Sequence, residues 1–515
     1  METGQNVQQL EPQQETGDIS IGSDEWVAQV EQRRRRRAGI WGRLTTTWQA
    51  IPAGGRVGLV ILLLLVTPVI TGTPLALELL GIANNDFIVR IGTTFLAFSV
   101  LTVGLTVVVG YAGLLDLGYI AFYGIGGYAY AYLASDFLST LHVAENGVHL
   151  PSVVGVPLII ALTALIGWLL GSASIRLVGD YLAIVTLGFG LLFVQLATSL
   201  TRVKLFWLDR SVDLTRGPNG INGLDNISLF GYEFKSTLQY YYLFLILTGI
   251  VVLIVYHLNH SRIGRAWRAM REDQLATEVM GMPVRRLKLM AFAMGAGIAA
   301  LAGSVQAAWQ GNVAPNRYSA LTLIDLYAMI VLGGTGSLPG ALLGAFAFTA
   351  LPEILRNVQV ASFLFYIGLV AALFWWLKPA WRFVAVVAGT LIGGLILKGI
   401  VNMLWPAFDT RVAPAAGSFL NRWVQTWLVL PENAKLYGNL AIGVAVLLLL
   451  LATMSKGRRR LPLLAVALYT LIFAWETRLV VEPAVTRILF VGTTLVVFMI
   501  VRPEGLLGKP RVTVV

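Results

Sequence analysis

Long apolar runs alternate with short polar connections along most of the chain. About fourteen of these runs approach the roughly 20 residues that a helix needs to cross a bilayer. Because lipid offers no hydrogen-bond partner to the backbone, such runs are predicted to be α-helices. The period-two alternation that is typical of membrane β-barrels is not evident. The predicted spans are residues 57–70, 88–109, 114–133, 153–170, 181–200, 241–256, 289–308, 321–332, 342–355, 362–377, 383–401, 439–453, 463–475 and 487–501.

Composition also indicates a membrane protein. Hydrophobic residues make up 57% of the chain and charged residues 13%, whereas a soluble domain needs more polar surface to cover its core. The predicted fold class is therefore an all-α polytopic membrane protein with about 14 transmembrane helices. Residues 1–55 are polar and then basic at Arg33–Arg37. Their composition predicts a disordered cytoplasmic segment and not a cleavable signal peptide.

The net charge of +11 comes largely from basic residues beside the ends of the predicted spans. This placement explains the charge without nucleic acid. When the N-terminus is assigned to the inside, the successive spans assign the most basic connections to the inside as well. The positive-inside rule then predicts that both termini are cytoplasmic and that the loop 201–235 is outside. The inside connections are residues 261–288, 378–382, 456–460 and 502–511.

Several kinds of chemistry are excluded by the residues themselves. The chain has no cysteine, which excludes disulfides, thiolate catalysis and cysteine metal sites. Its four histidines form no HExxH pattern, and no GxxxxGK[ST] nucleotide-binding loop occurs, because the glycine-rich stretch 332–340 lacks the lysine. We therefore expect a protein that is not an enzyme and uses no cofactor or metal of its own. If transport consumes ATP, another subunit must bind it.

The predicted cytoplasmic loop at residues 258–288 contains a short amphipathic pattern. Residues 271–280 are predicted to be helical, with Leu275, Val279 and Met282 in one apolar stripe and with Gly281 as the stop signal. Such a helix can dock into a groove of a soluble partner. It can equally lie on the membrane surface with its arginines near lipid phosphates. The pattern alone leaves both interpretations open.

This loop resembles the cytoplasmic loop of ABC import permeases that couples to the ATPase, in the form found in the branched-chain amino-acid permease family. The family pattern is Arg-Ala-x-Arg-Glu-Asp, then Ala and Glu, then Met-Gly. Thr277 stands where the family has a second Ala, which is a mild departure because Thr is a poorer helix former. The residues that fill the pattern are Arg268, Ala269, Arg271, Glu272, Asp273, Ala276, Glu278, Met280 and Gly281.

Other stretches resemble the same family in the same order. They are GYAGLLDLGYIAFYGIGGYAY at 110–130, GDYLAIVTLGFG at 179–190 with GPNGI at 217–221, AMIVLGGTGSLPG at 328–340 and RPEGLLG at 502–508. The wording of the first two is similar to the M-type permease subunit. Leu191 replaces a Glu that the family has after Gly-Phe-Gly, so any polar contact of that Glu is in doubt here.

The resemblance implies an architecture and a function. It implies a permease core at residues 56–378 and a final span with a basic tail at 487–515. Residues 379–486 have no place in the family pattern and are predicted to be an insertion of about four spans. The implied function is the import of leucine, isoleucine and valine across a bacterial inner membrane. The implied partners are a homologous permease subunit, two cytoplasmic ATPase subunits that hydrolyse ATP, and a periplasmic substrate-binding protein. Urea or short amides are alternative substrates within the family.

A secondary transporter driven by an ion gradient is the alternative from a different class. It would use broken helices and buried carboxylates, but it would not need the amphipathic loop helix. Gly333, Gly334 and Gly336 interrupt an apolar pair of segments. They indicate either a broken helix that lines the path or a tight cytoplasmic turn, and the turn is preferred.

Three acidic residues lie in or beside predicted spans. A carboxylate at the centre of a membrane helix costs about 2.5–3.5 kcal/mol on insertion scales, so it tends to face a cavity or a partner. Asp325 lies deepest and is the first candidate for the translocation path. Asp180 is expected to cap the helix that follows it, and Asp116 fits either role.

Overall fold

The computed structural model describes residues 64–68, 85–140, 147–174, 180–201, 203–204, 211–354, 358–377, 380–405, 408, 423–424, 426–431, 434–454, 460–481, 492 and 505–507. The chain divides after Thr67, and of the first part residues 64–67 are described and are helical. The predicted N-terminal segment, most of the first predicted span and nearly all of the last one lie outside the described residues.

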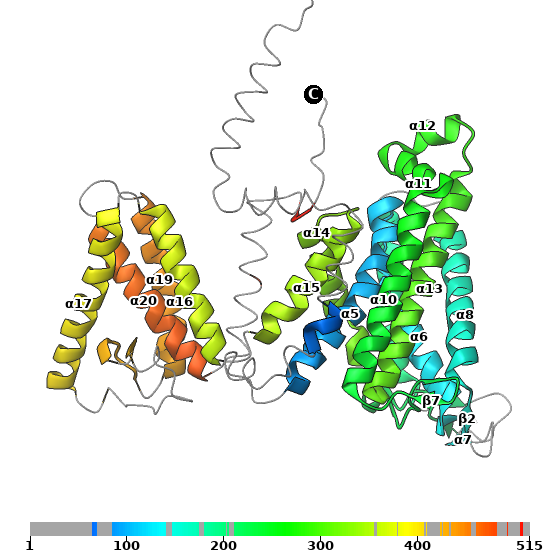
Figure 1. Cartoon of the computed structure of the whole chain (residues 1–515), viewed down its shortest axis with the longest axis horizontal. Coiled ribbons are helices and arrows are strands. Elements are labelled where there is room, and N and C mark those ends of the chain that lie inside the picture. Colours follow the sequence, from blue (N-terminus) through cyan, green and yellow to red (C-terminus); the bar gives the residue numbers. More distant parts are fainter. Residues whose placement is uncertain are drawn as a thin grey trace, which may run out of the picture. The chain divides into compact units, whose positions relative to one another are not determined.

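A bundle of apolar helices forms the first described group. Helix α13 packs against α8 and α6, and α5 packs against α10 and α15, as Figure 1 shows. Within the described part of the chain, seven helices are long and apolar enough to cross a membrane, and shorter apolar helices accompany them. The bundle helices are α5 (Asn85–Leu105), α6 (Tyr119–Leu133), α8 (Ser152–Ser174), α9 (Asp180–Ser199), α10 (Thr237–His260), α13 (Val284–Gln310), α14 (Ala320–Gly333) and α15 (Leu338–Ile354).

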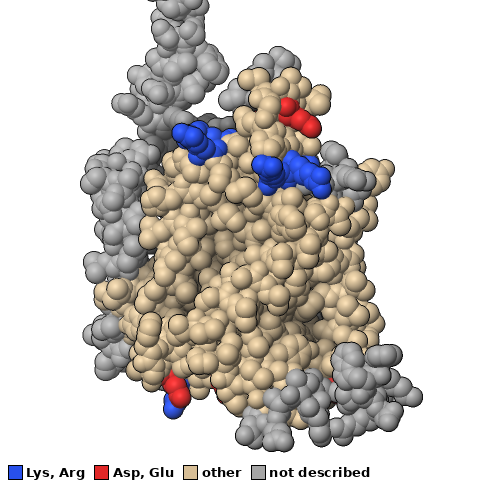
Figure 2. Space-filling view, turned by 90° about the vertical axis from the view of Figure 1, so that its right-hand side faces the viewer, with Lys and Arg blue, Asp and Glu red and all other residues tan. Residues whose placement is uncertain are grey.

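These helices confirm an all-α polytopic membrane protein, while the number fourteen stays a prediction. Each predicted span from 88–109 to 463–475 has a described helix within it. Charged side chains gather at the two ends of the bundle on the face seen in Figure 2, and the broad middle of that face is uncharged. This distribution is the one that a bilayer requires, because charges are least costly outside its hydrocarbon core.

Two details of the second and third predicted spans differ from the prediction. Helix α5 continues as a π-helix, η1 (Thr106–Tyr111). The predicted span 114–133 is helical only from Tyr119, because residues 112–118 form a loop. Gly113 in this loop has a φ of 69°, a left-handed conformation that favours glycine. Hydropathy could not separate this apolar loop from the helix that follows it.

Small residues allow α6 and α13 to approach closely. A Cβ at Gly126 would lie 2.5 Å from the Cα of Ala300, and a Cβ at Gly303 would collide with the backbone oxygen of Tyr123. The two helices therefore touch through their backbones, as small-residue interfaces do in membranes.

One end of the bundle, called here the strand end, carries short strands and turns. His149 there contacts Asp225 at 2.6 Å through Nδ1 and Asp136 at 3.0 Å through Nε2. Hydrogen bonds to Asp225 and then to Asp136 raise the pKa of His149. The antiparallel pairs are β1 (Ala134–Ser135) with β2 (Val148–His149), β3 (Val203–Lys204) with β4 (Ser211–Val212), β5 (Ile221–Asn222) with β8 (Asn312–Val313), and β6 (Ser228–Leu229) with β7 (Tyr232–Glu233). Three short helices lie among these strands: the single-turn α-helix α7 (Phe137–Thr140) and the 3-10 helices η2 (Gly217–Asn219) and η3 (Pro315–Tyr318).

A second group of helices follows. It comprises α16 (Val358–Trp376), α17 (Ala380–Leu404), α19 (Ala434–Met454) and α20 (Arg460–Val481). Phe365 of α16 stacks on Trp475 of α20 with ring centroids 4.0 Å apart. Tyr366 donates a 2.6 Å hydrogen bond to Glu476. Helix α16 lies before the boundary predicted at 378, yet it packs with helices of the predicted insertion.

The contact between α6 and α13 generates a stability prediction. Gly126→Ala should destabilise the protein by about 1–3 kcal/mol, because the added methyl group collides with backbone that cannot move aside. Gly188→Ala on α9 is the matched control, since no atom lies within 4 Å of its added Cβ. The control should be neutral or more stable by up to about 1 kcal/mol. Thermal unfolding of the purified protein, followed by tryptophan fluorescence, measures both, and equal midpoints would contradict the prediction.

Candidate coupling site and translocation path

The predicted amphipathic helix at 271–280 is in fact part of two helices. They are α11 (Arg262–Glu272) and α12 (Gln274–Val279). Asp273 lies between them with φ −151° and ψ 109°, and its side chain accepts a 3.0 Å hydrogen bond from the N–H of Ala276. An Asp in this position caps a new helix instead of continuing the old one. The prediction of one continuous helix is therefore wrong at Asp273.

The end of α12 is as predicted. Gly281 has a φ of 78°, and its N–H donates to the carbonyl of Glu278 at 2.9 Å. The N–H of Met282 donates back to the carbonyl of Thr277 at 3.3 Å. This pair of bonds ends the helix at a left-handed glycine, which is a common helix stop.

Helix α12 presents an apolar face that the described part of the chain leaves exposed. Leu275, Val279 and Met280 are 73%, 79% and 78% exposed. Thr277 is buried, and its hydroxyl donates to the carbonyl of Asp273 at 2.7 Å. Met282, predicted to belong to the stripe, is half-buried, and Met280 takes its place on the exposed face. The two loop helices lie at the end of the bundle opposite the strand end (Figure 1), which we call the coupling end.

Helix α11 is fixed to the bundle by an aromatic anchor. Trp267 is fully buried, and its indole N–H donates to the carbonyl of Leu287 on α13 at 2.8 Å. Met270 is buried beside it. Arg268 lies near enough to Tyr111 for its charge to act on the phenol. A displacement of α11 therefore acts directly on α13 and on the end of η1.

Arg271 connects α11 to two further elements. Its guanidinium donates to the carbonyl of Gly110 in η1. A Cβ at Gly113 would lie 2.7 Å from Cγ of Arg271, and a Cβ at Gly336 would lie 2.8 Å from its Nη1. Both glycines have positive φ. The side chain is thus held between the end of η1 and the connection from α14 to α15.

The glycines at 333–340 form a tight turn between α14 (Ala320–Gly333) and α15 (Leu338–Ile354), whereas the cytoplasmic position of this turn stays a prediction. Helix α14 ends at Gly333, and Gly334 has a φ of 108°. The C-terminal residues 505–507 join this turn, because the N–H groups of Leu506 and Leu507 donate to the carbonyls of Leu332 and Gly333 at 2.8 and 3.0 Å. Sequence reasoning missed this contact. Its only local signal is Gly505, where a Cβ would lie 2.5 Å from the Cα of Gly334.

The three predicted acidic residues do not converge. Asp116 is buried in the loop before α6, where its carboxylate accepts a 2.9 Å hydrogen bond from the N–H of Gly118. The backbone oxygen of Asp116 accepts a 2.6 Å hydrogen bond from Tyr327 of α14. Asp325 is half-buried in the second turn of α14, about 12 Å along the helix from Gly333. Asp180 is exposed and is the first residue of α9.

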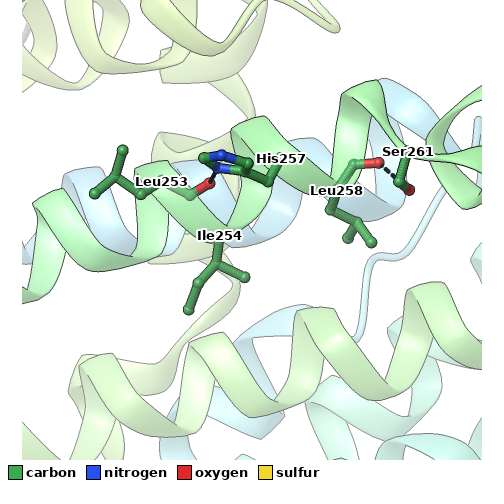
Figure 3. A pocket seen from close by; sticks show the side chains of 5 residues that line it. All are labelled: Leu253, Ile254, His257, Leu258 and Ser261. Atoms are coloured by element: carbon green, nitrogen blue, oxygen red, sulfur yellow. Dashed lines mark hydrogen bonds between the residues drawn. The ribbon is translucent and has the colours of Figure 1, made fainter.

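A shallow groove on α10 offers no further chemistry. Figure 3 shows its lining, in which the polar side chains turn back to their own helix. His257 donates to the carbonyl of Leu253 at 2.9 Å, and Ser261 donates to that of Leu258 at 2.7 Å. Ile254 completes the lining. The groove therefore presents mainly apolar surface.

Comparisons with known proteins agree with this geometry. The profile of a family described as "Branched-chain amino acid transport system / permease component" matches residues 87–374. The high-affinity branched-chain amino acid transport system permease protein LivM of Escherichia coli K12 is 35% identical over 315 residues, which are 56% of this chain and 68% of that protein. The LivM protein of Salmonella typhimurium is 34% identical with the same coverage.

Other relatives are more distant. The LivH permease protein of Escherichia coli K12 is 26% identical over 259 residues, which cover 50% of this chain and 80% of LivH. No solved structure matches the chain. The matched residues 87–374 contain the bundle, α11, α12 and the α14–α15 turn. Helices α17, α19 and α20 and the segment 505–507 lie beyond them.

Proposed function

The chain belongs to the branched-chain amino acid transport permease family and is of the LivM type, and on this premise we propose that it is a membrane-spanning subunit of an ABC importer for leucine, isoleucine and valine. The importer would combine this chain with a homologous permease subunit, two cytoplasmic ATPase subunits and a periplasmic binding protein. ATP would be hydrolysed in the ATPase subunits. The single observation that carries the coupling role is the uncovered apolar face of α12.

The exposed face of α12 suits a protein groove. Three large apolar side chains are exposed here: Leu275 and Val279 on the six-residue helix and Met280 directly after it. A groove that covers them gains about 1.5–3 kcal/mol for each side chain that becomes fully buried. Glu278 beside them is exposed and offers a charge that a partner surface can recognise.

The contacts of α11 provide a route from that face into the bundle. A partner that moves α12 also moves α11, because Asp273 alone separates them. Trp267 carries the displacement to α13. Arg271 carries it to η1 and to the α14–α15 turn. Closure of the ATPases would thus reach three membrane helices through two side chains, and alternating access would release the amino acid inward.

We assign the coupling end to the cytoplasm of a bacterial cell and the strand end to the periplasm. The basic loop 261–288 supports this orientation. With this assignment, both termini are cytoplasmic. Activity of a cytoplasmic reporter fused at Thr16 and after Val515 tests the topology, and Asn219 in the strand end is the matched insertion site for a periplasmic reporter. Periplasmic activity from either terminal fusion would reverse or break the assignment.

Asp325 remains the first candidate for the translocation path among the acidic residues. It lies within an apolar helix where a carboxylate is costly, and it is half-buried, so part of it faces outward from the chain. That outward part can face the partner permease across a shared path. Asp116 instead has a structural contact with Tyr327, and Asp180 lies exposed at a helix start.

Asp325→Ala should reduce leucine uptake by the reconstituted importer by about tenfold or more, because a retained intramembrane acid generally serves transport. Glu233→Ala is the control, since Glu233 forms an exposed ion pair with Lys235 at the strand end, and such pairs contribute little. Asp225 is a poor control because it holds His149. Uptake is compared at equal membrane abundance, and equal rates for the two variants would remove Asp325 from the path.

Two variants of α12 test the coupling role. Glu278→Arg and Gly281→Val should each reduce ATP-dependent leucine uptake by roughly tenfold or more and weaken co-purification of the ATPases. The first reverses a charge on the docking face. The second places a β-branched residue at a φ of 78°, where it is strongly disfavoured.

Matched substitutions separate coupling from general damage. Gly281→Asn should retain most activity, because Asn tolerates left-handed backbone, and Glu233→Arg reverses a charge at the opposite end. If α12 lies on lipid instead, the Glu278 and Gly281 variants keep the ATPases bound and stimulated by loaded binding protein. That outcome contradicts the coupling role. Uptake that does not require the ATPase subunits would contradict the proposed function itself.

A further inference from the structure

A short strap crosses the strand end between α13 and α14. It consists of residues 312–318, which include β8 and η3. The strap packs against α6 and α9, and β8 pairs with β5. Val313 and Tyr318 are fully buried. A connection so deeply placed normally carries few polar groups that lack partners.

An aromatic wall surrounds the end of the strap. The Tyr318 ring lies 4.9 Å from Tyr123 and 6.1 Å from Tyr128, both on α6, and 6.0 Å from Phe193 on α9, measured between centroids. Gly124 and Gly127 make room for these rings, because a Cβ at either position would collide with Phe193 or with the Tyr318 hydroxyl. The packing of these rings therefore depends on the two glycines of α6.

Three polar atoms, one in the strap, one in the wall and one just before the strap at the end of α13, lack hydrogen-bond partners among the described residues. They are Nη1 of Arg317, the hydroxyl oxygen of Tyr128 and Oε1 of Gln310, and all three are buried. Tyr128 as a whole is only 5% exposed. Nη2 of Arg317 makes a long 3.5 Å contact with Asn312, and no described Asp or Glu forms an ion pair with it.

Leaving such atoms unpaired costs about 1–3 kcal/mol each, and more for a charged group. Another polar group of the wall does have a hydrogen-bond partner, because the Tyr123 hydroxyl donates to Gln306 at 2.6 Å. Arg317 is close enough for its charge to act on the phenols of Tyr123 and Tyr318. A half-buried guanidinium with one buried nitrogen, a hydroxyl donor among aromatic rings and a carbonyl acceptor next to the strap in sequence suit a ligand that carries both charges and an apolar body.

We propose that the strap and the aromatic wall form a recognition site for a free aliphatic α-amino acid, with Arg317 and Tyr128 binding its carboxylate, Gln310 its ammonium group and the rings its side chain. Arginine binds carboxylates through paired N–H donors. Branched aliphatic groups pack well on ring faces. This inference rests on the proposed function and adds to it the residues that recognise the substrate.

Equilibrium binding of radiolabelled L-leucine tests the site. The complete complex of this chain, its partner permease and the ATPases is used without binding protein. Leucinamide, which lacks the carboxylate, and 4-methylpentanoate, which lacks the ammonium group, compete with leucine. The wild type should prefer leucine over each competitor by at least about tenfold, because each lacks one charged contact.

Each variant should remove one part of that preference. Arg317→Gln should abolish the preference over leucinamide, and Arg317→Lys should restore part of it. Gln310→Leu should abolish the preference over 4-methylpentanoate only. Tyr128→Phe, which removes one oxygen and keeps the ring, should weaken leucine binding several-fold. Arg216→Gln is the control, because Arg216 is exposed at the strand end over Phe137.

The outcomes separate this inference from the proposed function. Co-purification of every subunit at the wild-type ratio shows that each variant complex is assembled, and Tyr128→Phe carries the test if the Arg317 variants do not assemble. Unchanged competitor preferences in the variants, or no leucine binding by the wild type, overturn the recognition site. ATP-dependent leucine uptake with binding protein would then still support the importer. Loss of that uptake in the wild type overturns both.

Discussion

In an apolar medium every backbone carbonyl must be satisfied by the chain itself, and the ends of helices are where this is hardest. At the coupling end, two helices stop with carbonyls that their own turns cannot pair. Arg271 donates to Gly110 at the end of η1, and residues 506 and 507 donate to Leu332 and Gly333 at the end of α14. The loop of α11 and the C-terminal segment therefore complete the ends of the helices that they contact.

This arrangement makes the coupling end a single mechanical unit. Three glycines, Gly113, Gly336 and Gly505, let the capping groups approach at distances that a side chain would prevent. The close approach leaves little freedom for α11 to move alone, because packed interiors transmit displacement instead of absorbing it. A short loop helix can then act on distant spans without extensive contacts of its own.

The sequence predicted the parts of this structure that depend on local pattern. Hydropathy located the bundle helices, and glycine chemistry predicted the stop at Gly281 and the turn after Gly333. A sequence pattern that fits two local structures was predicted less well. The pattern places Asp273 inside a helix although it caps one, and it places residues 114–118 inside a span because this part of the loop is apolar. Contacts between distant segments, such as residues 505–507 on α14 or Arg317 beside Tyr123, have no local periodicity and required the fold.

Helix α14 joins the two ends of the bundle. It follows the strap directly, and its 14 residues span about 21 Å before the glycine turn. Tyr327, midway along it, donates to the backbone of Asp116 in the loop before α6. On the proposed coupling, a shift at the strap would be carried along one helix to the turn that Arg271 contacts, and a shift of α11 would be carried back by the same path. Because coupling between two sites is reciprocal, an amino acid bound at the strap and an ATPase bound at α12 would each change the affinity for the other through α14, and Asp325 lies on the helix between them.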